Sequence, residues 1–353
     1  MLELEDEVPS YKKCLDELLK GGVTPNYKRY ARPLPNILEK NPFWERVSWA
    51  TRPEGGGIPV ERRERKIQQV ENMVVPARAI IEHALAKRDK RKRLKVVEFC
   101  GGSGYVLLPL AQLYPHVDFV LVDCKAKSIQ IARKRIAAAS LKENVQVIEG
   151  RIQDYREDFD VGIALHACGA LSDIVLELCM DSRAGFVVCP CCIGKISFMH
   201  KLPRSKRVSA ALSATSAPTL WTSLLKAADF GHTGQTWYTP RNRDRRVCKA
   251  IVEEDRRLLC EERGFTTSLL IMTPSSASPK SDVLVGWPRY IREAGERPAD
   301  QAMTESPPAP SLSPFHGELE LVEAVEPTET LPDFLFRQMF PAVKSPSMGS
   351  RLR

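Results

Sequence analysis

The sequence predicts a doubly wound α/β fold, in which helices cover both faces of a mostly parallel sheet of seven strands. Strand-like and helix-like segments alternate over residues 94–189. Such alternation is typical of parallel sheets, because each crossover between parallel strands needs a helix-length connection. A glycine-rich turn at residues 98–104 joins the first strand to its helix. The chain has 353 residues, 43% of them hydrophobic, which is enough for such a core and for extensions beside it.

The apolar periodicity places each element along the chain. A helical pattern begins at Ile67 and ends at Leu85, ahead of the first strand. The seven strands are expected at residues 94–97, 118–122, 145–148, 161–165, 184–189, 267–272 and 282–286. The helices between them are expected at residues 105–111, 129–139, 172–180, 220–228 and 247–263. Gly264 is expected to stop the last helix.

Composition divides the chain into three parts. Residues 1–60 form an N-terminal extension, residues 61–288 hold the α/β domain, and residues 289–353, rich in proline, serine and acidic side chains, are expected to be a disordered tail. The acidic N-terminus lacks the layout of a signal peptide, and no apolar run reaches transmembrane length. We therefore expect a cytoplasmic protein, with a nuclear location left open, and no membrane partner. The sequence does not indicate the oligomeric state.

The glycine-rich turn indicates a nucleotide-like ligand. Residues 98–104 read Glu-Phe-Cys-Gly-Gly-Ser-Gly, and glycines let backbone N–H groups approach a ligand closely. The second strand ends in Asp123, near the spacing of about 20 residues at which an acidic side chain meets ribose hydroxyls. The glycines do not follow the G-x-G-x-x-G spacing that holds a dinucleotide pyrophosphate. They suit the looser acidic-x-G-x-G-x-G loop of class I methyltransferases, with Cys100 in the first glycine slot.

Histidine and cysteine side chains follow the fourth and fifth expected strands. The fourth strand leads into His166 and Cys168, and the fifth into Cys189, Cys191 and Cys192. Neighbouring parallel strands end at the same edge of a sheet, so these side chains are expected to lie together beside the ligand. Three interpretations stay open: the cysteines only pack the strand ends; Cys168, Cys189 and Cys192 hold zinc with His166; or a thiolate reacts with the acceptor, with His166 as base. We take His166, Cys168 and Cys191 as candidate catalytic residues and assign no metal.

Several ordered motifs carry a resemblance to a known family. They lie at residues 97–104, 164–169 with Asp173, 189–192 with Gly194, 245–249, 255–256 and 278–286. In these motifs, over about residues 60–288, the chain resembles the methyltransferase domain of the glutathione S-transferase C-terminal-domain-containing protein family. It is similar, more loosely, to methyltransferase-like proteins and tRNA 2′-O-methyltransferases. Residues 1–60 do not look like a complete transferase-type domain, so a glutathione-binding role is not implied.

The resemblance implies a Rossmann-like class I methyltransferase fold with S-adenosyl-L-methionine as its cofactor. The residues expected to contact this cofactor are, from its methionine end to its adenine, Glu98, Gly102, Gly104, Asp123, Gln153 and Asp154. In this assignment Asp123 accepts hydrogen bonds from the ribose, and Asp154 accepts one from the exocyclic amine of the adenine. His166 and Cys168 are expected to face the transferred methyl group.

Basic segments near the expected opening favour a nucleic acid as the acceptor. The net charge is +8, and residues 62–66, 201–207 and 241–246 are rich in arginine and lysine. Such side chains neutralise phosphates. The sequence thus predicts an S-adenosylmethionine-dependent methyltransferase whose substrate is RNA, either tRNA or rRNA. Methylation of a protein or a small molecule is one alternative, and a cofactor- or RNA-binding adaptor without catalytic turnover is another.

Overall fold

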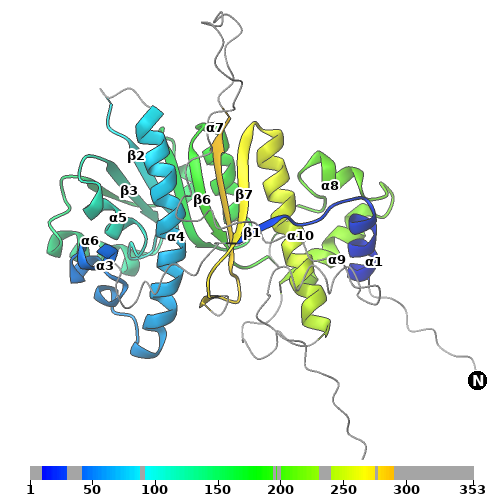
Figure 1. Ribbon diagram of the computed structural model, residues 1–353, viewed down its shortest axis with the longest axis horizontal. Helices are drawn as coiled ribbons and strands as arrows, with labels where there is room; N and C mark the ends of the chain where they lie inside the picture. The colour runs from blue at the N-terminus through cyan, green and yellow to red at the C-terminus, as the bar shows by residue number, and fades with distance from the viewer. Residues whose placement is uncertain are drawn as a thin grey trace, which may run out of the picture.

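The computed structural model describes residues 10–29, 42–87, 92–193, 196, 200–229, 240–274 and 277–289. Within these residues, eight strands form one sheet in the order β1-β7-β8-β6-β5-β2-β3-β4 (Figure 1). The strands are β1 (Tyr27–Arg29), β2 (Lys95–Phe99), β3 (Asp118–Asp123), β4 (Val145–Glu149), β5 (Val161–Ala167), β6 (Gly185–Pro190), β7 (Phe265–Ile271) and β8 (Asp282–Pro288). Strands β2 to β8 are the seven that the sequence predicts.

The pairing of these strands confirms the predicted mostly parallel sheet. Strand β8 runs antiparallel to both of its neighbours, β6 and β7, and the other paired strands are parallel. From β2 the chain proceeds outward to β3 and β4, and then returns to the other side of β2 for β5 and β6. Doubly wound sheets bind ligands at such a reversal, beside the carboxyl ends of the strands. This is the Rossmann-like arrangement that the resemblance implies.

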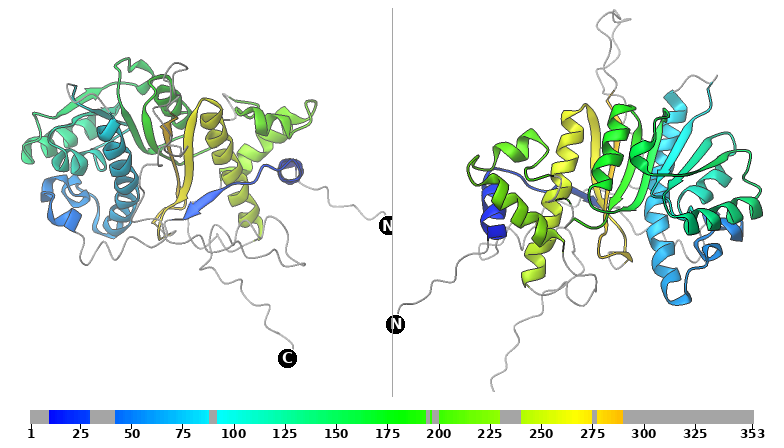
Figure 2. Two further views of the ribbon diagram at one scale, coloured as in Figure 1. Left: turned by 45° about the horizontal axis from the view of Figure 1, so that its top comes forward. Right: turned by 180° about the vertical axis from the view of Figure 1, so that it is seen from behind.

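The eighth strand comes from the N-terminal extension, and the sequence analysis did not predict it. Strand β1 pairs in parallel with β7, opposite residues 269–271. The left view of Figure 2 shows the chain running from α1 (Ser10–Lys20) into this blue strand at the sheet edge. Three residues are too few to display an apolar alternation, so the sequence pattern carries no signal for such a strand.

Helices cover both faces of the sheet, as predicted (Figures 1 and 2). Helices α4 (Val60–Lys87), α5 (Leu107–Leu113) and α6 (Ala126–Ala138) pack on one face, and α7 (Leu171–Asp181) and α10 (Pro240–Glu262) on the other. Because the strands are buried on both sides, adjacent residues enter different cores. Val96 packs on the α4 side and Val97 on the α7 side.

Shorter elements complete the described structure. They are α3 (Pro42–Glu45), α8 (Lys206–Ala210), α9 (Ala217–Ala228) and the 3-10 turns η1 (Trp49–Thr51), η2 (Pro53–Gly56) and η3 (Ile152–Asp154). Helices α1, α8 and α9 form a second core with α10, which lies to the side of the sheet in Figure 1. The N-terminal extension therefore packs on the domain at both α1 and β1.

A network of buried charges joins α10 to β8 and α7. Asp282 pairs with both Arg246 and Lys249, and all three side chains are fully buried. The same network continues along α10, where Lys249 Nζ lies 2.8 Å from Glu253 Oε1 and Arg256 Nε lies 2.9 Å from Asp173 Oδ1. The two cations hold the pKa of the Asp282 carboxyl well below its usual range, against the opposing effect of burial. Many of the motif residues behind the family resemblance thus have a structural role.

Within the described residues, no helix has both the length and the apolar composition needed to cross a bilayer. The tail expected at residues 289–353 lies outside the described residues, apart from Arg289.

Candidate active site

The glycine turn after β2 adopts backbone conformations that its glycines make accessible. Gly102 and Gly104 have φ values of 58° and 75°, and Cys100, in the first glycine slot, has a φ of 54°. A Cβ atom at Gly104 would lie 2.8 Å from Leu108, so the turn packs too closely on α5 for any side chain there. At Gly102 a Cβ atom would meet nothing within 4 Å. The Cα atom of Gly102 therefore borders open space, which leaves room for a ligand beside the turn.

Asp123 ties the end of β3 to this turn. Its Oδ2 accepts a hydrogen bond from the Gly102 N–H at 2.8 Å, and its Oδ1 accepts one from the Lys125 N–H at 2.8 Å. The residue is buried. Each carboxylate oxygen can accept a further hydrogen bond. The position at the carboxyl end of β3 suits the predicted ribose contact, and that contact stays a prediction.

Glu98 lies beneath the turn, where the backbone of α5 begins. Its Oε2 accepts a hydrogen bond from the Leu107 N–H at 3.1 Å, and the side chain is 2% exposed. Burial raises the pKa of Glu98 to about 8, although bonds from backbone N–H groups and the nearby Arg135 oppose the rise. The carboxyl group is therefore neutral at pH 7 in the free protein. A cationic ligand group beside it would favour its ionised form.

The two residues predicted to flank an adenine lie on η3, which follows β4. Gln153 is half-buried and Asp154 is exposed. The connection that carries them is held beside the end of β3, because the Gly150 N–H donates to the Asp123 carbonyl oxygen at 3.0 Å. Both residues thus lie near the carboxyl edge of the sheet, and their contact with a ligand stays a prediction.

His166 sits at an irregularity in β5. The pairing of β5 with β6 shifts register between Leu165 and Ala167, and His166 between them has a φ of 66°. Its Nε2 lies 3.0 Å from Gln69 Oε1 on α4. Because an amide oxygen only accepts, Nε2 carries the proton, and the Nδ1 lone pair remains. Burial and the charges of Lys66 and Arg65 lower the pKa of His166 to about 4, so the ring is neutral.

Gln69 is a site residue that the sequence did not reveal, and Lys66 was singled out only as part of the basic segment at residues 62–66. Gln69 Oε1 also accepts from Lys66 Nζ at 2.8 Å, and Gln69 Nε2 donates to the Ala277 carbonyl at 2.8 Å. Burial lowers the pKa of Lys66 to about 8. The periodicity identified α4 as a helix, and the spacing of three between these polar residues places them on one face. The helical pattern does not indicate which strand end this face of α4 packs against.

The cysteines after β5 and β6 meet as predicted, with one exception. The sulfur atoms of Cys168, Cys191 and Cys192 all lie within 4.8 Å of one another, and Cys168 Sγ is 2.8 Å from Cys191 Sγ. The hydrogen bond from Cys191 holds the pKa of the Cys168 thiol below its usual value, against the effect of burial. A backbone hydrogen bond of 2.7 Å from the Gly169 N–H to the Cys192 carbonyl joins the two loops.

The exception is Cys189, which the zinc interpretation included. Its side chain belongs to the buried core on the α4 face, and its Sγ contacts the Lys280 carbonyl at 3.5 Å. Burial raises the pKa of this thiol to about 12. Cys189 is still within β6, so its side chain is fixed by the alternation of the strand, whereas Cys191 and Cys192 follow the strand end. The structure therefore joins neither Cys189 nor His166 to the group of three sulfur atoms.

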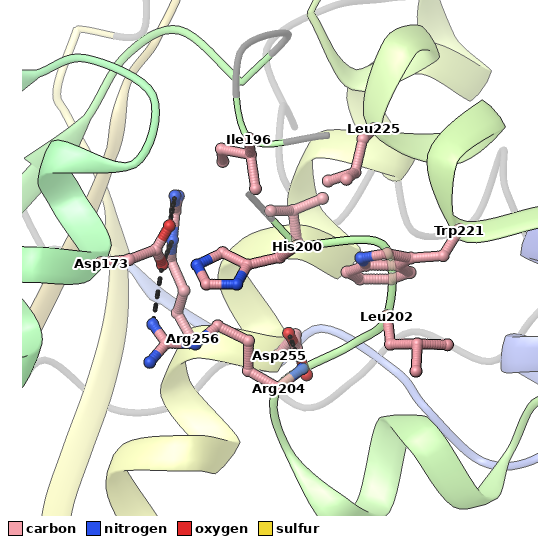
Figure 3. Close-up of a pocket in the computed structure, with 10 residues that line it drawn as sticks. Asp173, Ile196, His200, Leu202, Arg204, Trp221, Leu225, Asp255 and Arg256 are labelled. Atoms are coloured by element: carbon pink, nitrogen blue, oxygen red, sulfur yellow. Dashed lines mark hydrogen bonds and ion pairs between the residues drawn. The ribbon is translucent and has the colours of Figure 1, made fainter. Parts of the chain in front are cut away.

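A small pocket lies beside these loops, between α7, α9 and α10 (Figure 3). Asp173 on α7 pairs with Arg256 of α10 and with Arg204. His200 lies between Asp173 and Trp221 in this view. Asp173 belongs to the same sequence motif as His166. In the structure its carboxylate forms ion pairs with Arg204 and Arg256, and the pair with Arg256 joins α7 to α10.

Of the basic segments, the first half of α4 lies nearest to the site. Arg62 and Arg65 are exposed there, and the charge of Arg65 acts on His166. In the second segment Arg204 is engaged with Asp173 and Glu177. In the third, Arg246 is fully buried in the charge network, so it cannot reach a phosphate. The side chain of Arg241 lies outside the described residues.

Residues 65–198 match a family model described as a methyltransferase domain. The chain is 30% identical over 293 residues to the glutathione S-transferase C-terminal domain-containing protein of Bos taurus, covering 80% of this chain and 44% of that protein. It is also 30% identical over 292 residues to the Homo sapiens protein of the same name, and this match covers 80% of this chain and 43% of that protein. The chain thus spans less than half the length of these curated relatives. A shorter match, to ribosomal RNA small subunit methyltransferase G of Colwellia psychrerythraea, is 37% identical over 76 residues, covering 21% and 35%.

Two solved structures resemble parts of this chain. The fibrillarin pre-rRNA processing protein of Methanococcus jannaschii has a TM-score of 0.35 at 14% identity, covering 57% of this chain and 69% of that one. A putative caffeoyl-CoA O-methyltransferase from Staphylococcus aureus has a TM-score of 0.32 at 13% identity, covering 55% and 76%. At these scores the likeness adds nothing to the strand order described above.

Proposed function

We propose that the protein is an S-adenosylmethionine-dependent methyltransferase that acts on RNA, starting from the match of residues 65–198 to a family model described as a methyltransferase domain. The proposal is supported most directly by what meets at the carboxyl edge of the sheet. The glycine turn follows β2, Asp123 ends β3, His166 lies near the end of β5, and Cys168 directly follows β5. These three strands are neighbours in the sheet.

The residues of the turn suit the cofactor. S-adenosylmethionine has no phosphate, so it needs acceptors for its amino group and ribose hydroxyls rather than an anion cradle. Glu98 and Asp123 supply carboxyl groups at the ends of β2 and β3, and the open space before Gly102 leaves room for backbone approach. Gln153 and Asp154 would flank the adenine from η3. When bound, the cofactor supplies an electrophilic methyl group on a sulfonium.

The His166 and Cys168 side chains favour transfer to a nitrogen or a ribose oxygen. Such a transfer needs alignment of the acceptor and, for a hydroxyl, a proton acceptor. A neutral His166 with its Nε2 proton fixed by Gln69 would orient the acceptor through Nδ1. Transfer to a pyrimidine carbon instead needs a covalent thiolate. Cys168 is exposed and would be the thiol placed for that alternative.

RNA is favoured as the acceptor by charge. The net charge of +8 and the exposed Arg62 and Arg65 on α4 suit the phosphates of a nucleic acid, and the charge of Arg65 acts on His166. Arginine and lysine side chains that neutralise phosphates supply a large part of nucleic-acid affinity. An acceptor without negative charge would gain nothing from Arg62 and Arg65.

The test is transfer of radiolabelled methyl groups from S-adenosylmethionine to total RNA and to total protein, followed by analysis of the labelled nucleosides. We expect label in one modified nucleoside of tRNA or rRNA and none in protein. Arg62→Glu/Arg65→Glu should reduce the transfer to RNA. Label in protein alone would show that the acceptor is a protein and not RNA. Cofactor binding without any methyl transfer would support the adaptor alternative.

A further inference from the structure

Three thiols gather at the carboxyl edge of β5 and β6 in a way that packing does not explain. Among the described residues, Cys168, Cys191 and Cys192 form the group in which at least three histidine, cysteine, aspartate or glutamate side chains could ligate one ion. Cysteines that act as small apolar side chains are buried, as Cys14, Cys179, Cys248 and Cys260 are here. Cys168 is exposed and Cys192 is half-buried, so this explanation fails for two of the three.

The backbone fixes the two loops that carry these thiols. Cys168 follows β5 and Cys191 follows β6, and these strands pair along most of their length. Beyond the paired residues, the Gly169 N–H donates to the Cys192 carbonyl at 2.7 Å. The sulfur atoms therefore approach from two loops held in register rather than by chance contact of mobile side chains.

We propose that Cys168, Cys191 and Cys192 bind a zinc ion. Zinc takes cysteine sulfur at about 2.3 Å in tetrahedral geometry, which places ligand sulfurs about 3.8 Å apart. The three sulfurs lie within 4.8 Å of one another, so the group has the size of such a site. Ligation moves Cys168 and Cys191, now 2.8 Å apart, away from each other by about 1 Å. Sets of three thiolates select thiophilic ions over calcium or magnesium.

The proposed site differs from a closed structural zinc site. The described residues supply three ligands, and structural zinc sites use four, whereas sites with three protein ligands leave one position for water or substrate. Cys168 is exposed and directly follows β5, two residues after His166. An open fourth position at this exposed edge would be available to water or to the acceptor.

A disulfide between Cys168 and Cys191 is the competing explanation. It would account for the short contact between two sulfurs, but it would leave Cys192 without a reason to lie beside them. The two explanations also differ in the oxidation state of the cysteines. Zinc binds reduced thiols as thiolates, whereas a disulfide forms only with an oxidant.

The first experiment measures metal content in the full chain. The protein is expressed with zinc in the medium and purified under reducing conditions, without chelators or a histidine tag. We expect about one zinc per chain in the wild type and much less in Cys168→Ser, Cys191→Ser and Cys192→Ser. Cys124→Ser is the matched control, because Cys124 is an exposed cysteine that follows β3 at the same edge and lies outside the group. It should keep its zinc.

A second experiment needs only the wild-type chain, so it does not depend on the folding of the variants. Thiol alkylation followed by peptide mass spectrometry should show Cys168 and Cys192 protected with zinc bound and modified after removal of zinc. Cys124 should be modified in both states. Cobalt substitution should add sulfur-to-cobalt charge-transfer absorption. Reduced protein that carries no zinc and takes up neither zinc nor cobalt would overturn the proposal, as would zinc retained in all three serine variants. These readouts do not depend on methyl transfer.

Discussion

Glu98 is the residue whose ionisation the fold alters in the most testable way. Its pKa of about 8 in the folded chain results mainly from burial. In the unfolded chain the pKa of a glutamate is about 4.3. The folded state therefore binds the proton more tightly, and the associated stability is fully present below pH ~4 and is lost as the pH rises through about 8.

We therefore expect the free energy of unfolding of the wild type to fall across this window relative to that of Glu98→Gln, which cannot ionise. The measurement is urea denaturation of both proteins between pH ~5 and ~9 without ligand. The difference between the two curves isolates Glu98 from the other titrating groups. If the free energies of unfolding of the two proteins vary with pH in parallel, Glu98 has an ordinary pKa. That result would contradict the buried environment described here.

His166 and the cysteines should differ in their effect on methyl transfer. If the acceptor is a nitrogen or a ribose oxygen, His166→Ala removes the group that orients it, whereas Cys168→Ser and Cys191→Ser retain part of the activity. Initial rates of labelled transfer to RNA check this order. A protein–RNA adduct trapped with a 5-fluoropyrimidine substrate, and lost in one of the serine variants, would contradict it and make that cysteine the nucleophile.

The sequence predicted which of these residues gather, but not their partners. Position at the ends of β5 and β6 sufficed to bring Cys168 and Cys191 together, because parallel strands end at one edge. The contact of His166 with Gln69 depends on how α4 lies across the sheet and on the register shift in β5. Such packing has no local signature, since a helical pattern shows which residues share a face and not what that face meets.

At the scale of elements, α4 is held to the sheet by polar contacts as well as by its apolar face. Asn72 Nδ2 donates to the Thr273 carbonyl at 2.8 Å, and the Thr273 N–H donates to Asn72 Oδ1 at 2.8 Å. Asn72 is 1% exposed. One amide thus satisfies both backbone groups of a residue in the connection from β7 to β8.

Asn72→Ala should lower the free energy of unfolding by about 1–3 kcal/mol, because it removes two hydrogen bonds to the partly buried backbone of Thr273. Gln68→Ala on the same helix is the control, since Gln68 Nε2 donates to Glu64 Oε1 at 3.2 Å in an exposed contact, and its effect should stay within about 0.5 kcal/mol. Both are measured by urea denaturation. Equal effects of the two substitutions would show that the Asn72 contact does not hold α4 in place.

Element boundaries followed the sequence where turn residues bound an apolar run on both sides. Strands β2 to β6 formed close to their predicted bounds, because each is a short apolar run between turns. Helix α10 begins at Pro240 rather than at residue 247, because its first turns carry a run of arginines that reads as a basic loop. Arg246 in this run is in fact buried, and its partner Asp282 is distant in sequence. Buried ion pairs of this kind cannot be recognised without the fold.

At the scale of the whole molecule, the charge network around Asp282 connects α10 to the sheet. Removing one partner of a buried ion pair leaves an uncompensated charge, which costs about 3–5 kcal/mol. Asp282→Asn keeps the shape of the side chain and removes its charge, so we expect a loss of that size in the free energy of unfolding.

Asp118→Asn is the matched control for this prediction. Asp118 pairs with Arg93 at 2.7 Å, but both side chains are largely exposed, and such pairs contribute about 0–1 kcal/mol. Urea denaturation of both variants gives the comparison. A loss for Asp282→Asn no larger than that for Asp118→Asn would contradict the structural role assigned to the network.

The central claim is that the carboxyl edge of β2, β3 and β5 binds S-adenosylmethionine. Calorimetric titration of the full chain tests it most directly. We expect a one-to-one complex, and weaker binding to Asp123→Ala by about 1.5–3 kcal/mol, or about 10- to 150-fold in Kd, because a charge-assisted hydrogen bond to the ribose is lost. A thermal unfolding curve of the free variant separates lost binding from lost folding. A folded wild-type chain that takes up no S-adenosylmethionine would contradict the claim.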